Sequence, residues 1–98
     1  MMDYRENAGY VITDSCHVGE SEFVLGVHLT APQQFVTWKC KDRTDYYWGH
    51  YFSSLFDAQK DLVARAHEEV QYLEQRGIDP NKICLLYTSD AADEARSV

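Results

Sequence analysis

The clearest hydrophobic periodicity in the chain lies between residues 55 and 73. Apolar side chains recur there in steps of three or four, at Leu55, Ala58, Leu62, Ala66, Val70 and Leu73. This spacing places them on one face of an α-helix, which has about 3.6 residues per turn. Val63 widens the stripe, and most charged residues fall away from it. The pattern therefore predicts one long amphipathic helix.

Both ends of this helix carry residues that are typical of helix caps. Ser54 is the expected N-cap, with Asp57 three residues later in a variant of the capping box. Gly77 suits the left-handed position after a helix, and Ile78 can then contact Leu73 in a Schellman ending. We therefore expect the helix to begin next to Ser54 and to end just before Gly77.

The chain before the helix alternates between apolar and polar residues, which is typical of half-buried strands. We predict four strands, at about residues 10–17, 22–29, 35–41 and 46–52. Gly19 suits a two-residue type II′ turn, which places residues whose numbers sum to 39 opposite each other. One face of this hairpin is then apolar apart from Asp14. The predicted fold class is α+β, a four-stranded antiparallel β-meander followed by one long α-helix packed on one face.

The pairing of the later strands is less constrained. If residues that sum to 65 pair between the second and third strands, Val36, Trp38 and Cys40 continue the apolar face. A sum of 86 between the third and fourth strands sets Trp48 opposite Trp38, whereas a sum of 87 sets Gly49 there. Both pairings of the fourth strand stay open.

Aromatic side chains lie on both faces of the fourth strand. Tyr46, Trp48 and Phe52 share one face, and Tyr47 and Tyr51 share the other. One helix covers only one of these faces, and exposed aromatic surfaces bind peptides, stack bases or form dimers. The candidate binding surface is an aromatic face with a lysine beside it: Phe35, Lys39, Tyr46, Trp48 and Phe52. The alternative is that another segment covers this face.

The predicted helix is also longer than the strands beneath it. About 22 residues of helix span about 33 Å, whereas strands of seven or eight residues span about 23–27 Å. The stripe at Val70 and Leu73 is therefore expected to overhang the sheet and to need another partner.

Charge and cysteine content argue against several classes of protein. The net charge of -7 disfavours nucleic acid and anionic membranes as partners. The sequence has no long apolar run and no secretory leader, which predicts a cytoplasmic protein. No cysteine or histidine spacing is typical of zinc, so we expect neither metal nor cofactor.

Asp14 is unusual because it falls on the predicted apolar face. A buried carboxylate near His50 and Tyr47 would suit a small enzyme or ligand-binding domain, but those side chains would have to converge from distant strands. We therefore assign no catalytic residue. The preferred hypothesis is a small non-enzymatic interaction module that binds a protein partner or a second copy of itself.

The end of the chain differs in character from the rest. Residues 84–94 have the sequence CLLYTSDAADE, which resembles the in-frame translation of a transposase-type sequencing adapter. The resemblance implies a single domain of residues 1–83, truncated at its C-terminus, and an artefactual tail without structure at residues 84–98. It also implies that the natural protein continues differently after Ile83.

Several short segments resemble small accessory proteins carried on conjugative elements of Gram-positive gut bacteria. These segments are residues 3–10, 22–26, 35–38, 48–51 and 58–62. The resemblance implies a cytoplasmic accessory role in a mobile element, and it implies no particular activity.

Overall fold

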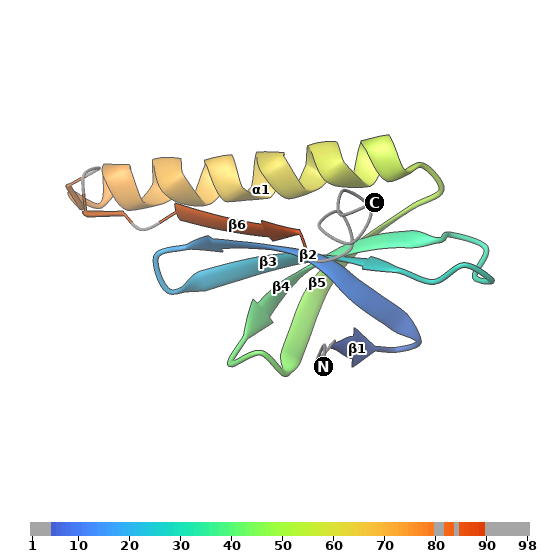
Figure 1. The fold of residues 1–98 in the computed structure, drawn as a ribbon. Helices are drawn as coiled ribbons and strands as arrows, with labels where there is room; N and C mark the ends of the chain where they lie inside the picture. Colours follow the sequence, from blue (N-terminus) through green and yellow to red (C-terminus); the bar gives the residue numbers. More distant parts are fainter. Residues whose placement is uncertain (1–4, 80–81, 84, 90–98) are drawn as a thin grey trace, which may run out of the picture.

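The computed structural model describes residues 5–79, 82–83 and 85–89 (Figure 1). The elements are β1 (Glu6–Asn7), β2 (Tyr10–Val18), β3 (Ser21–Val27), β4 (Phe35–Lys41), β5 (Asp45–Phe52), α1 (Leu55–Gln75) and β6 (Leu85–Ser89). All of the strand pairs are antiparallel, and α1 lies across one face of the sheet. The α+β class is therefore confirmed, but the prediction of four strands is wrong because β1 and β6 add two.

The two additional strands share the edge of β2 that β3 does not use. β1 pairs with the start of β2 through a turn in which Ala8 and Gly9 have φ of 54° and 86°. Both values are left-handed, as a type I′ turn requires. β6 pairs with residues 14–18 of β2. Five residues of the tail that was expected to lack structure therefore form a strand, while the origin of that tail stays a prediction.

The predicted caps of α1 are confirmed. The Ser54 side chain accepts a hydrogen bond from the Asp57 amide at 3.3 Å. At the other end, Gly77 has φ of 87°, and the Ile78 amide donates to the Leu73 carbonyl at 3.1 Å. This last bond is the wide turn of a Schellman ending. Local side-chain chemistry thus fixes both ends of the helix.

The first hairpin follows the predicted pairing over half its length. Residues 14–18 pair with 21–25 to the sum of 39, and Gly19 has φ of 60°. A bulge at Thr13 then shifts the sum to 38, so that Ile12 lies opposite Gly26. A one-residue shift turns each following side chain to the other face. Tyr10 and Ile12 therefore face away from α1, contrary to the prediction.

The predicted pairing of the third strand is wrong. β3 and β4 pair to a sum of 62, with Val24 opposite Trp38, because β3 ends at Val27 and residues 28–34 form the connection. The difference from 65 is odd, so the two faces of β4 are exchanged. Phe35, Thr37 and Lys39 face α1, whereas Val36, Trp38 and Cys40 lie on the far face.

Both predicted pairings of the fourth strand occur, in different halves of it. Lys39 lies opposite Tyr47, so the residue numbers of this pair sum to 86. Thr37 lies opposite His50, so the numbers of that pair sum to 87. The change falls at Trp48, which has φ of 57°. Positive φ is rare for a bulky side chain, so the bulge is held by its surroundings.

Within the described residues, two apolar clusters lie on opposite faces of the sheet. The helix-side core contains Cys16, Val18, Phe23, Leu25, Ala58, Leu62 and Ala66. The far-side core contains Tyr10, Ile12, Val24, Val36, Trp38 and Cys40. Val70 and Leu73, which were expected to overhang, pack against the helix-side core, since β2 is nine residues long. In the described part of the chain, no helix is both long and apolar enough to cross a membrane.

Candidate functional site

The five residues predicted to form one aromatic face are divided between the two faces. Phe35 and Phe52 lie opposite each other and pack against the helix-side core. Lys39 and Trp48 also face α1, with the Lys39 ammonium 5.4 Å from the centre of the Trp48 ring. Tyr46 lies on the far face, 5.5 Å from the Trp38 ring. These residues therefore do not form a common binding surface.

Trp48 instead borders a cleft of about 370 Å³ between β5 and α1. His50 Nδ1 lies 3.0 Å from Asp61 Oδ2 in this cleft, and the Thr37 hydroxyl donates to the same oxygen at 2.5 Å. Arg65 donates to the Thr37 hydroxyl at 3.2 Å and to the Trp48 carbonyl. The network joins α1 to β4 and β5, and it holds the bulge at Trp48.

The chemistry available in this cleft is limited. Asp61 can orient the His50 imidazole, as a carboxylate does beside a general base. Among the described residues that line the cleft, however, none is a serine or cysteine able to act as a nucleophile. Burial lowers the pKa of Arg65, and the nearby carboxylates of Asp61 and Glu68 oppose this effect. The positive charge of Arg65 is therefore balanced by acidic side chains in the same cleft. Its evident role is to attach the helix.

The structure does not bring Asp14, His50 and Tyr47 together. β3 and β4 lie between β2 and β5, which separates Asp14 from His50 by about three strand spacings, or about 14 Å. Tyr47 packs edge-on against Trp48, with their ring centres 5.0 Å apart. His50 has Asp61 as its carboxylate partner instead of Asp14.

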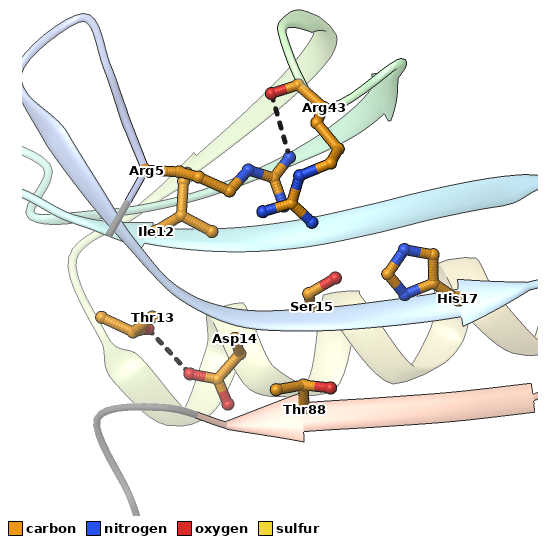
Figure 2. A pocket seen from close by; sticks show the side chains of 8 residues that line it. All are labelled: Arg5, Ile12, Thr13, Asp14, Ser15, His17, Arg43 and Thr88. Carbon is orange, nitrogen blue, oxygen red and sulfur yellow. Dashed lines mark hydrogen bonds between the residues drawn. The ribbon is translucent and has the colours of Figure 1, made fainter. Parts of the chain in front are cut away.

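A small cavity of about 100 Å³ lies at the edge of β2 on the other side of the sheet (Figure 2). Arg5 forms two hydrogen bonds with Glu22 beside it, of 2.7 and 3.1 Å, and Ser15 donates to Glu22 at 2.5 Å. Figure 2 also shows Arg5 donating to the Arg43 carbonyl. Burial raises the pKa of Glu22, but the bonds from Arg5 and Ser15 lower it more, to a net value below 4.5. This cluster stabilises the far-side core.

An apolar depression lies between α1 and β6, and we call it the strand groove. Its volume is about 350 Å³, and its lining is mainly apolar, with one histidine: Cys16, Leu62, Val63, Ala66, His67, Val70, Leu85 and Tyr87. Several of these side chains remain open to solvent, with Val63 62 % exposed and Leu85 61 % exposed. Figure 1 shows β6 running beneath α1 and beside β2. The groove is therefore incompletely closed by the strand that occupies it.

Asp14 lines the small cavity of Figure 2, next to the strand groove, and is 8 % exposed. Its Oδ1 accepts a hydrogen bond from the Thr13 hydroxyl at 2.7 Å, and its Oδ2 accepts one from the Tyr87 hydroxyl. Burial and the bond to Asp14 raise the pKa of Tyr87, so this hydroxyl keeps its proton at neutral pH. Asp14 is unusual in the sequence, as noted above, but its donor lies in the segment that the sequence assigned to a tail.

No protein-family model, no curated protein and no solved structure matches this chain. The geometry of the groove and of the two polar clusters is therefore the basis for proposing a function.

Proposed function

We propose that this protein is a small, non-enzymatic interaction module that binds an extended segment of a protein partner. The segment adds as a strand to the outer edge of β2 and places apolar side chains in the strand groove. The observation that carries the proposal is β6 itself, which pairs with residues 14–18 in this way. Addition of a strand to a sheet edge is a common mode of peptide recognition, in which backbone hydrogen bonds supply affinity and alternate side chains supply specificity.

The occupant of the groove buries little of its own surface. Leu85, Leu86 and Tyr87 are 61, 56 and 48 % exposed. Apolar burial contributes about 25 cal/mol per Å², so side chains that stay half exposed hold the strand only weakly. A partner segment that covers the open side of the groove, including Val63, would bury more apolar surface and displace β6.

The proposed origin of residues 84–94 agrees with the weak attachment of β6 to the groove. If these residues are translated adapter sequence, the groove is filled by a strand that was not selected for it. Pairing needs only backbone groups and apolar residues at alternate positions, which Leu85 and Tyr87 supply. The cytoplasmic location and the accessory role in a mobile element stay predictions from the sequence.

The proposal is tested by displacing β6 from the groove with substitutions and then adding the same strand as a separate peptide. The full chain carrying Leu85→Asp and Tyr87→Asp should release β6, because both apolar contacts in the groove are lost and the carboxylate at position 87 replaces the hydroxyl that donates to Asp14. A dye-labelled peptide of residues 82–90 should then bind with saturable fluorescence anisotropy. The unaltered chain should bind the same peptide at least about ten-fold more weakly, because β6 competes from within the molecule.

Two controls make the result specific. A peptide with the same two aspartates should not bind, and adding Val63→Asp to the emptied chain should weaken binding of the unaltered peptide. Circular dichroism establishes that each variant stays folded. A folded, emptied chain that shows no saturable binding would contradict the proposal. If light scattering shows that the emptied chain dimerises, the partner in the groove is a second copy of this chain and not a segment of another protein.

A further inference from the structure

The buried carboxylate of Asp14 lies next to the strand groove and accepts a hydrogen bond from Tyr87, which lines it. We infer, resting on the function proposed above, that Asp14 determines specificity by selecting a tyrosine on the incoming strand at the position opposite Cys16. The partner segment is then an extended strand in which an apolar residue is followed two positions later by tyrosine.

The first step of the argument concerns what a buried carboxylate requires. Asp14 lies on the helix side of β2, two residues from Cys16, and its cross-strand neighbour is the fully buried Leu25. A carboxylate in such surroundings is costly unless hydrogen-bond donors satisfy both oxygens. Thr13 supplies one donor from β2 itself, through the bulge at that position. The second oxygen depends on a donor from the strand in the groove.

The pairing of β6 shows which position can supply that donor. Tyr87 lies opposite Cys16 and Leu85 lies opposite Val18, so both side chains project to the helix side. Asp14 is the diagonal neighbour of Tyr87, at a spacing of about 7–8 Å that an aromatic side chain can span. The Tyr87 hydroxyl accordingly reaches Asp14 Oδ2. Phenylalanine fills the same apolar space but leaves this oxygen without a donor.

The side chains on the other face of the strand contribute less to specificity. Leu86 and Thr88 lie opposite His17 and Ser15, on the far side of the sheet, and both are exposed. Substitutions at these positions change no contact in the groove. The selected pattern therefore comprises the residues opposite Val18 and Cys16, with the hydroxyl of the second as its polar determinant.

The test compares peptides on the emptied chain, Leu85→Asp with Tyr87→Asp. Replacing the tyrosine of the peptide of residues 82–90 by phenylalanine should weaken binding about ten-fold or more, since a bond to a buried charge is lost. Replacing Leu86 of the peptide by alanine, the matched control, should change the dissociation constant less than about three-fold. Equal binding of the tyrosine and phenylalanine peptides would overturn the inference.

A second variant removes the carboxylate instead of the hydroxyl. With Asp14→Leu added to the emptied chain, the phenylalanine peptide should bind at least as well as the tyrosine peptide. If that chain does not fold, Asp14→Asn keeps the shape of the side chain and should narrow the tyrosine preference, because the acceptor is no longer charged. An unchanged preference in the folded variant would also overturn the inference. If no peptide binds to the emptied chain at all, the strand-binding function fails before the question of specificity arises.

Discussion

The two faces of this sheet are closed in different ways. On the helix side, small and aliphatic residues such as Val18 and Leu25 pack against Ala58 and Leu62 of α1. On the far side, no helix of the described chain covers the sheet, yet Trp38 is only 4 % exposed. One face therefore obtains its cover from a separate element, and the other obtains it from large side chains of the sheet itself.

The far face depends on aromatic contacts and on one ion pair. The Trp38 ring lies 5.6 Å from Tyr10 and 6.4 Å from Tyr51, in edge-on arrangements that aromatic pairs favour. Arg5 and Glu22 close the same cluster, with side chains that are 17 and 6 % exposed. The comparison indicates that a sheet face without a covering helix can still be buried by its own side chains. That face then includes the charged side chains of Arg5 and Glu22, and its stability depends on their ion pair.

The largest effect should come from the contact between the helix and the sheet. Leu62 is fully buried at the centre of the helix-side core, so Leu62→Ala should cost about 3 kcal/mol of unfolding free energy. Its neighbour Val63 is 62 % exposed, and Val63→Ala should cost less than about 1 kcal/mol. Urea unfolding followed by circular dichroism measures both. Similar losses in the two variants would show that α1 does not close this face through Leu62.

The ion pair of the far face should produce the next largest effect. Glu22→Gln leaves the Arg5 guanidinium without its carboxylate and should cost about 2 kcal/mol at neutral pH. Glu20→Gln, in the exposed turn next to it, is the matched control and should cost less than about 0.5 kcal/mol.

The same substitution has a predicted pH dependence. Because the pKa of Glu22 is lowered below 4.5 in the folded state, its stabilisation is complete above pH 4.5 and disappears as the pH falls through the folded value. The difference in urea midpoint between the unaltered chain and Glu22→Gln should therefore narrow as the pH falls from neutral to below 4.5. A difference that stays constant with pH would exclude the ion pair as its cause.

The parts of the fold that the sequence predicts correctly are set by neighbouring residues. Ser54 and Gly77 define the ends of α1 through bonds within one or two turns. Gly19 sets the pairing of β2 with β3 because only two residues separate the strands. In both cases the interaction energy is local, and one sequence contains all of the information needed.

The exchange of the two faces of β4 could not be predicted in the same way. Residues 28–34 form a connection whose length allows both odd and even pairings, and the bulge at Thr13 reverses the direction of Tyr10 and Ile12. Each choice depends on which pairing buries more side chains across the whole sheet. A single-residue shift then moves a complete set of residues, including Trp38, to the opposite core.

The candidate site was also predicted only in part from the sequence. The alternation that placed Tyr46, Trp48 and Phe52 on one face fails at the bulge, since Trp48 has φ of 57°. The anomaly of Asp14 is visible in the sequence, whereas its donor Tyr87 lies 73 residues away along the chain. Sequence patterns thus identify residues that need a partner more readily than they identify the partner.

The smallest expected effect tests the bulge that divides β5. A Cβ atom on Gly49 would lie 2.8 Å from Trp38 Nε1 and 3.1 Å from Tyr51 Cε1, so Gly49→Ala forces the far-side aromatic rings to move. We expect a cost of about 1–2 kcal/mol and a change in tryptophan fluorescence, because overpacking strains a close-packed core. Ser53→Ala, at an exposed position after β5, should leave both quantities unchanged. An unchanged stability of Gly49→Ala would mean that the aromatic rings of the far face repack easily. The two faces of the sheet would then differ in the kinds of side chain that bury them, and the far face would not be rigidly packed.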